Sequence, residues 1–184
     1  MPPEELGFHV REAIEVAGAK RIGHAVDVIY DSEVAGLLKN MASNDIAVEI
    51  NLTSNDVILG VSGKQHPFEL FRNFNVPLTV STDDEGVSRI DLTHEYQRAV
   101  ETYDLSYGDI KQMARNALEY SFLEGESLFI GRDLNQIVSA CKKAFSNKMH
   151  SNSNCREFLN TNAKANAQSE LEQDFMMFED MYDK

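Results

Sequence analysis

Residues 76–86 read VPLTVSTDDEG, and this stretch decides the fold. Its β-rich composition predicts a short strand over 76–82, and the acidic pair Asp83 and Asp84 follows where that strand ends. Two earlier runs have the same character, KRIGH at 20–24 and IAVEI at 46–50. Helical segments separate the three runs, and strands that alternate with helices predict βαβ units in a parallel sheet.

The helical segments are identified by the spacing of their apolar residues. Before the third strand, helices are expected over residues 4–19 and 32–41 and from His66-Pro67 onward, whereas residues 51–56 have loop chemistry. After the third strand only helices are expected, over residues 93–103, 107–122, 134–145 and 155–182. Ser106 and Asp109 form the signature of a capping box at the start of the second of these.

The length of the chain bounds its architecture. At 184 residues it normally forms one domain or two small ones, whereas a complete eight-stranded β/α barrel takes about 250. The expected fold class is therefore α/β, an incomplete TIM-type barrel followed by C-terminal helices. Residues 1–148 are expected to form the barrel portion, and residues 149–184 to add an amphipathic helix that packs on it. Because three strands leave two bare sheet edges, marginal stability or self-association is expected.

The composition argues against several classes of protein. Lys and Arg number 17 against 30 Asp and Glu, a net charge of −13, so nucleic acid is not expected as a partner. No apolar run is long enough for a membrane helix, and the start, MPPEE, lacks the features of a signal peptide. Cys141 and Cys155 are too few for a disulfide framework, so inert thiols in a reduced, cytoplasmic protein are expected.

Polar residues gather at the carboxyl end of each expected strand. His24 follows the first strand, Ser54 and Asn55 the second, and Asp83 and Asp84 the third. In β/α folds this is the end where ligands bind. An Asp pair there either caps a turn or divides its work between a metal and a substrate. His24 is either a buried, hydrogen-bonded histidine or a general base beside a metal-bound water.

Six segments carry a family resemblance. They are the runs RIGHA at 21–25, EINLTSN at 49–55, HP at 66–67, STDD at 81–84, LTHEY at 92–96 and RNALEYSF at 115–122. In order and spacing they resemble the motifs of the adenosine deaminase family. The resemblance implies a zinc-dependent hydrolase of purine metabolism on a β/α barrel, which converts adenosine to inosine and ammonia.

The resemblance also assigns roles to three residues. It implies that Asp83 ligates zinc, that Asp84 hydrogen-bonds the purine ring, and that His24 orients a metal-bound hydroxide and helps to move its proton. That hydroxide attacks C6 of the adenine ring. The chain departs from the family at Asn51-Leu52, where Cys-Pro is usual, and at Glu85, where Pro is usual. These departures bear on the shape of the rim and the fit of the substrate.

Two family motifs are missing from the chain. The family takes two zinc-binding histidines from H-x-H and one more, with a proton-shuttling glutamate, from H-A-G-E. None of the five histidines lies in H-x-H, and the H-x-x-E at His9 is interpreted as an ordinary part of the first helix. The resemblance thus implies the last three barrel strands, with a start just after the H-A-G-E loop. We expect no activity and negligible zinc affinity from the chain alone, because a catalytic site needs about three protein ligands.

Two functions of different kinds remain open. In the first, the chain is the carboxyl-terminal part of an adenosine deaminase that works once a complementing N-terminal barrel half is supplied. In the second, it is a non-catalytic truncated homologue that only associates with other chains. Whether the chain alone is an enzyme stays open, as does deamination of a related aminopurine instead of adenosine.

Overall fold

The computed structural model describes residues 6–131, 133–146 and 153–182. The chain divides into two compact units, Met1–Tyr120 (unit 1) and Ser121–Lys184 (unit 2). The division expected between residues 148 and 149 lies outside the described residues and stays a prediction, as does the packing of a last helix on a barrel. Each unit is described by itself.

Unit 1 alternates helices and strands up to its third strand and is helical from there on. Its elements are α1 (His9–Glu15), β1 (Arg21–Gly23), the 3₁₀ helix η2 (Val26–Tyr30), α2 (Val34–Ser43), β2 (Ala47–Ile50), α3 (Leu52–Leu59), the 3₁₀ helix η3 (Gly63–Gln65), α4 (Phe68–Asn73), β3 (Leu78–Val80), α5 (Glu85–Ser88), α6 (Leu92–Tyr103) and α7 (Tyr107–Glu119).

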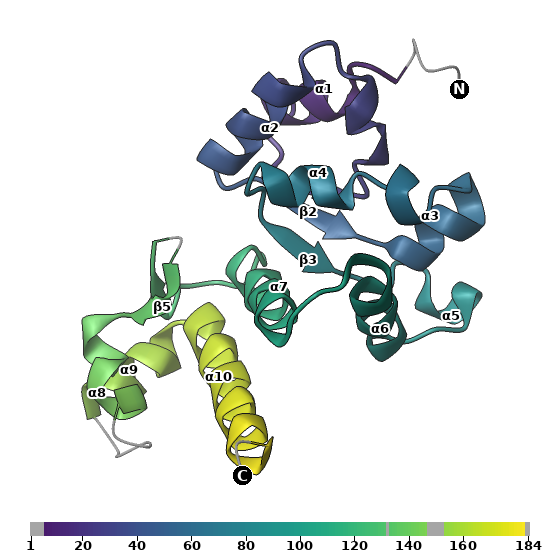
Figure 1. The fold of residues 1–184 in the computed structure, drawn as a ribbon. Coiled ribbons are helices and arrows are strands. Elements are labelled where there is room, and N and C mark those ends of the chain that lie inside the picture. The colour runs from purple at the N-terminus through teal and green to yellow at the C-terminus, as the bar shows by residue number, and fades with distance from the viewer. Residues whose placement is uncertain (1–5, 132, 147–152, 183–184) are drawn as a thin grey trace. The chain divides into compact units, whose positions relative to one another are not determined.

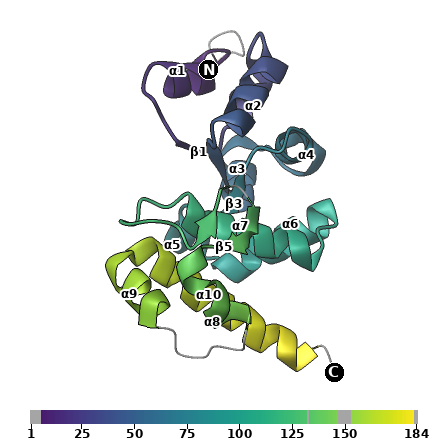
Figure 2. The same ribbon diagram turned by 90° about the vertical axis from the view of Figure 1, so that its left-hand side faces the viewer.

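The three predicted strands form one parallel sheet in the order β1-β2-β3. Ile22 pairs with Val48, and Val48 pairs with Leu78, so the register runs across the whole sheet. β2 lies at the centre, and β1 and β3 are the outer strands among the described residues. Figures 1 and 2 show α7 beside β3, where Asn116 Nδ2 donates a hydrogen bond of 2.8 Å to the Leu78 carbonyl.

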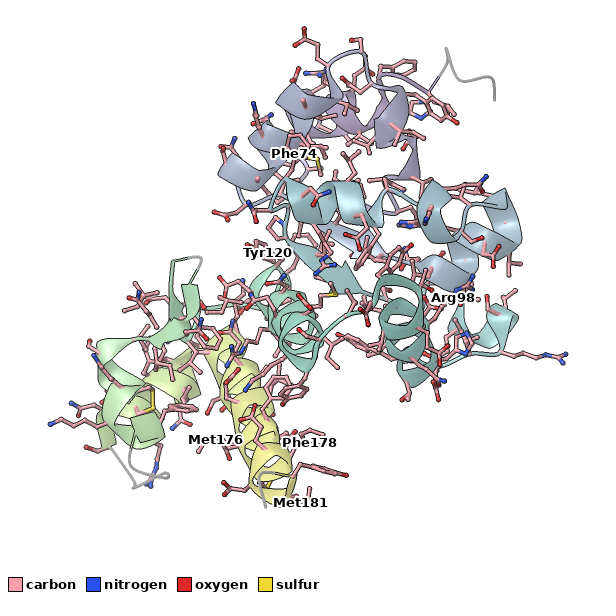
Figure 3. All side chains as sticks on the ribbon, in the orientation of Figure 1. Phe74, Arg98, Tyr120, Met176, Phe178 and Met181 are labelled. Atoms are coloured by element: carbon pink, nitrogen blue, oxygen red, sulfur yellow. A yellow bond between two sulfur atoms is a disulfide. The ribbon has the colours of Figure 1, made fainter. Side chains whose placement is uncertain are left out.

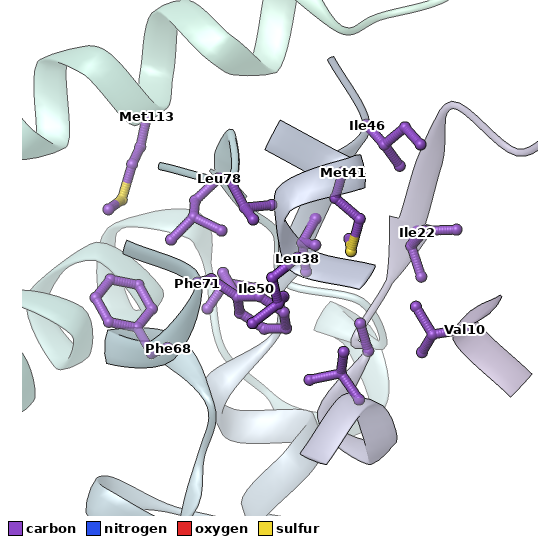
Figure 4. Close-up of a cluster of buried hydrophobic side chains, with 14 of the residues drawn as sticks. Val10, Ile22, Leu38, Met41, Ile46, Ile50, Phe68, Phe71, Leu78 and Met113 are labelled. Atoms are coloured by element: carbon purple, nitrogen blue, oxygen red, sulfur yellow. The ribbon is translucent and has the colours of Figure 1, made fainter. Parts of the chain in front are cut away.

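The core of unit 1 fills both faces of this sheet. Side chains from the strands, α1, α2, α4 and α7 meet in one cluster, part of which is seen in Figure 4. Ile50 of β2 and Phe71 of α4 have no exposed surface. Parallel strands are stable when covered on both faces, so the helices on either side hold the carboxyl ends of the strands in fixed positions.

The prediction of a loop over residues 51–56 is wrong. Asn51 is the N-cap of α3, and Thr53, Ser54 and Asn55 are buried in the first turns of that helix. Asn, Ser and Thr favour turns because their side chains bond nearby backbone groups, but here tertiary partners accept them inside a helix. The capping box at the start of α7 is confirmed, since Ser106 and Asp109 bond each other's backbone.

Unit 2 is smaller and differs more from its prediction. Its elements are the hairpin strands β4 (Phe129–Ile130) and β5 (Asp133–Ile137), followed by α8 (Ser139–Ser146), α9 (Ser153–Thr161) and α10 (Ala163–Tyr182). The expected helix over 134–145 begins only at Ser139. The expected helix over 155–182 is two helices, separated at Asn162. Met176, Phe178 and Met181 lie along α10 in Figure 3.

The prediction of two inert thiols is also wrong. Cys141 of α8 and Cys155 of α9 form a disulfide and lie in the buried cluster of unit 2. Disulfides persist in oxidising compartments, so this bond counts against the cytoplasmic location, which stays a prediction. Of the helices that the structure describes, none is both long and apolar enough to span a membrane.

Candidate active site

The ends of the three parallel strands bring His24, Ser54 and Asp83 into contact. Ser54 Oγ donates a hydrogen bond of 2.8 Å to Asp83 Oδ2, and His24 Nε2 lies 3.4 Å from the same oxygen. The side chains of His24 and Asp83 are 37% and 34% exposed, so both reach solvent. One carboxylate oxygen at this rim therefore faces an imidazole and a hydroxyl that come from two other strand ends.

The backbone is unusual at two of these positions. His24 has a φ of 62° and Asp83 a φ of 55°, both in the left-handed region that residues with a Cβ rarely occupy. Ala25 follows His24 with a φ of 51°. Such backbone conformations cost of order 1–3 kcal/mol per residue and persist only where the surrounding packing holds them.

A row of buried polar side chains lies behind His24. Asn55 Nδ2 is 2.9 Å and Asn51 Nδ2 is 3.3 Å from His24 Nδ1, and His66 Nε2 is 3.1 Å from Asn55 Oδ1. Asn55 is 1% exposed and His66 is 3% exposed. Burial lowers the pKa of His66 to about 4, and the nearby His24 and Arg98 act in the same direction. His66 is therefore neutral at neutral pH.

A cleft of about 1020 Å³ opens beside this row. Its polar lining includes His24, Ser54, Asn55, His66 and Asp83, and its apolar lining includes residues of η2, α3 and α4. Sites for small molecules are mostly apolar hollows with a few convergent polar groups, and this cleft has that character.

Asp84 is not part of that lining. It is exposed and precedes α5 as its N-cap residue, and its side chain accepts no capping hydrogen bond from the backbone N–H groups of that helix. The structure thus brings together two of the three predicted site residues, His24 and Asp83, and leaves Asp84 beside them at the rim. The role that the resemblance gives to each residue stays a proposal.

Other motif residues do not face the cleft and instead stabilise the contacts between the helices and the strands. Arg21 forms an ion pair with Glu49 and donates hydrogen bonds of 3.3–3.4 Å to carbonyls at the end of α7, those of Tyr120 and Ala117. A cation is favourable there because it faces the negative end of the helix dipole. These residues hold α7 against β1 and β2.

A second fastening joins α6 to the start of α3. Buried Glu95 accepts hydrogen bonds from the Thr53 backbone N–H at 3.2 and 3.3 Å. Arg98, labelled in Figure 3, donates one of 3.1 Å to Thr53 Oγ1 and forms an ion pair with Asp56. Thr53 is followed by Ser54 and Asn55, so α6 determines where those two side chains stand.

Sequence reasoning missed the place of two residues in the site. It treated His66 as the opening of a helix and Asn51 as a departure from a motif, whereas both belong to the polar row behind His24. The signal in the sequence was the HP pair at 66–67, although no spacing rule connects it to a histidine 42 positions earlier. Only the packing of α3 between them brings the two imidazoles to the same amide.

A family model described as adenosine deaminase matches residues 4–129. The chain belongs to the adenosine deaminase family. An adenosine deaminase of Clostridium perfringens is 34% identical over 121 residues, which are 65% of this chain and 36% of that protein. The chain thus spans about a third of the length of the curated relatives it matches.

Solved structures confirm the expected fold class. The apo N6-methyl-AMP deaminase of Arabidopsis thaliana is 35% identical, with a TM-score of 0.54 over 67% of this chain and 34% of that one. An amidohydrolase of Burkholderia ambifaria solved with bound zinc shares the fold at 14% identity, with a TM-score of 0.56 over 92% of this chain and 40% of that one. The chain is α/β and corresponds to part of a TIM-type barrel.

The family resemblance implies a zinc cofactor, and the residues of this chain can be tested against that expectation. In the described part of the chain, no three His, Cys, Asp or Glu side chains are grouped as metal ligands. The rim offers the carboxylate of Asp83, whereas a catalytic zinc takes about three protein ligands. These side chains do not make a zinc site by themselves.

Proposed function

We propose that this chain supplies the last three strands of a zinc-dependent aminopurine deaminase and one side of its active site. The reaction is the hydrolysis of adenosine to inosine and ammonia. The observation that carries the proposal is the meeting of His24, Ser54 and Asp83 on one carboxylate oxygen at the carboxyl end of the sheet. A β/α barrel uses this end for catalysis.

Each residue has a defined part in this proposal. Asp83 offers its carboxylate as one metal ligand, with Ser54 holding the orientation of that group through Oδ2. His24 presents Nε2 beside the same oxygen, where it orients the attacking water. Asp84 is at the rim, where its carboxyl group hydrogen-bonds the purine ring. Bound zinc would supply hydroxide near neutral pH.

The remaining ligands are proposed to come from a complementing N-terminal barrel half. β1 and β3 are the outer strands of the described sheet, and in a closed barrel each would pair with a further strand. The complement is either the rest of a longer chain or a separate polypeptide. Without it we expect no turnover, because the chain contains neither H-x-H nor H-A-G-E.

The test is complementation in vitro. The chain and the N-terminal part of the Clostridium perfringens relative are mixed and refolded together in the presence of zinc. Zinc stoichiometry is measured by elemental analysis, and adenosine conversion is followed by absorbance. We expect activity from the mixture and none from either part by itself. We expect this activity to be lost with Asp83→Ala or His24→Gln. The exposed His94→Gln variant is the matched control. A mixture that associates and binds zinc without turnover would contradict the proposal.

The substrate has a second candidate within the same chemistry. The likeness to an N6-methyl-AMP deaminase favours testing an aminopurine nucleotide beside adenosine in the complemented preparation. A non-catalytic homologue that only associates with other chains is the competing function. It predicts binding to the N-terminal part with no turnover of either substrate.

A further inference from the structure

His66, Asn55 and His24 form a row of hydrogen-bonding groups from the interior to the rim of the cleft. They come from three separate places, the residue before Pro67 and α4, the first turns of α3, and the residue after β1. His66 and Asn55 are buried, and His24 is the member that reaches solvent. The row acts on the reaction through His24, and the importance of the row for catalysis therefore rests on the proposed function.

The deep end of the row fixes the position of one proton. His66 is neutral, so only one of its ring nitrogens carries hydrogen. Its Nδ1 is buried and has no hydrogen-bond partner among the described residues. An N–H there would be a buried donor without an acceptor, which proteins avoid more strictly than an unpaired acceptor. The proton therefore sits on Nε2, which donates to Asn55 Oδ1 at 3.1 Å.

The donor on His66 determines the orientation of the Asn55 amide group. Its oxygen accepts from His66, so its nitrogen Nδ2 faces His24 Nδ1 at 2.9 Å and can only donate to it. Asn51 Nδ2 approaches the same Nδ1 at 3.3 Å. A ring nitrogen that receives two amide donors is unprotonated. In the neutral imidazole the proton of His24 must then lie on Nε2, which faces Asp83.

The reversed arrangement is less favourable. If both amides were turned over, Asn55 Nδ2 would donate to His66 Nε2, and the proton of His66 would move to its unpartnered Nδ1. In the observed arrangement the unpaired group of Asn51 is its buried acceptor, Oδ1. After the reversal the unpaired group would be its buried NH₂ group. The reversal thus exchanges two unpaired acceptors for unpaired donors in the same buried places.

We propose that Asn55 and His66 are positioning residues that fix His24 in the Nε2–H tautomer, so that His24 meets the reacting water as a hydrogen-bond donor. A neutral His24 of this form has no lone pair at Nε2 and does not accept a proton there. It orients the water and stabilises the negative charge that develops on it. Proton transfer to the purine then falls to another group of the complete site.

The test reads the tautomer directly. Magic-angle-spinning NMR of the chain with ¹⁵N-labelled histidine distinguishes protonated from unprotonated ring nitrogens whatever the oligomeric size of the sample, and His24→Gln assigns the signals. We expect an unprotonated Nδ1 and a protonated Nε2 for His24 at neutral pH. A protonated Nδ1 would overturn the inference. Because neither zinc nor turnover is required, this result is independent of the complementation assay.

Two variants separate positioning from simple packing. Asn55→Asp replaces the donor with a carboxylate, which can only accept, so Nδ1 of His24 should become protonated. Asn73→Asp makes the same change at an exposed residue of α4 and should leave the signals of His24 unchanged.

If Asn55→Asp does not fold, His66→Leu and His66→Gln replace it. We expect His66→Leu to mix the two tautomers of His24 and His66→Gln, which retains a donor, to preserve the original one. An unchanged His24 in His66→Leu would overturn the role of His66.

Discussion

Unit 1 and unit 2 of this chain are stabilised by different means. In unit 1 a continuous apolar cluster surrounds a parallel sheet, with contributions from Val10 in α1 through to Met113 in α7. In unit 2 the sheet is a short hairpin, the buried cluster is small, and the disulfide-bonded cysteines are part of it. The first unit relies on buried area, whereas the second adds a covalent link to a small core.

This difference is explained by size. Hydrophobic stabilisation grows with the apolar area removed from water, at about 25 cal/mol per Å². Below roughly 70–80 residues a single core rarely suffices, and small bodies commonly add disulfides or a metal. Unit 2, Ser121–Lys184, falls below that size and unit 1 does not. The active-site rim lies in the unit whose packing can hold strained backbone at His24 and Asp83.

The largest effect should come from the core of unit 1. Phe71→Ala removes a side chain with no exposed surface and should lower the free energy of unfolding of unit 1 by about 3–5 kcal/mol. Unit 2 should keep its stability. Hydrogen exchange followed by mass spectrometry, peptide by peptide, measures the two units separately. Phe122→Ala, the same change at a residue 84% exposed, is the control. Equal losses of unfolding free energy in both units would show that they unfold as one body. This would contradict the proposed difference between the two units.

The second effect belongs to unit 2. Replacing Cys141 and Cys155 together by Ala should lower the stability of unit 2 by about 3 kcal/mol, because the link closes a short loop in the unfolded chain. Unit 1 should be unaffected. Free-thiol titration of the purified protein under denaturing conditions establishes whether the bond is formed, and urea unfolding with and without reductant measures its contribution. Two titratable thiols in unreduced protein would contradict the structure.

The sequence predicted unit 1 better than unit 2 for physical reasons. Alternating β-rich runs and apolar helical spacing are strong local signals, and all three parallel strands were found from them. In unit 2 the spacing around Leu134 fits a helix equally well. The choice of β5 depends on pairing with β4 through a turn at Gly131, whose φ is 62°. That pairing is a contact between strands, and periodicity along the chain does not report it.

The break between α9 and α10 has the same kind of cause. Asn162 stands between the two helices, where its Oδ1 accepts a hydrogen bond of 2.6 Å from the Glu126 backbone N–H and its Nδ2 donates one of 2.8 Å to the Phe158 carbonyl. A residue 36 positions away thus separates what the apolar pattern joined. At the rim, the strand ends predicted His24 beside Asp83, but the burial of His66 behind Asn55 required the packing of α3.

The smallest effect tests whether unit 1 unfolds as a single body. Ser106 Oγ accepts from the Asp109 N–H at 3.2 Å, and Asp109 Oδ2 accepts from the Ser106 N–H at 2.8 Å. Ser106→Ala removes half of this capping box and should cost about 1 kcal/mol at neutral pH. Ser32→Ala, at an exposed serine, should have little effect. If the cap belongs to one cooperative body, its loss should increase exchange in β3 as well as in α7. A loss confined to α7 would divide unit 1 further.

The same variant should respond to pH in a defined direction. The hydrogen bonds from Ser106, with a smaller contribution from Arg72, hold the pKa of Asp109 below its usual value. A carboxyl group with a lowered pKa in the folded state adds stability above its unfolded pKa of about 4, and this contribution is lost as the pH falls through the folded value. The difference between wild type and Ser106→Ala should therefore shrink in acid. Urea unfolding at a series of pH values measures it, and a difference that grows in acid would mean that the carboxylate of Asp109 does not stabilise this helix.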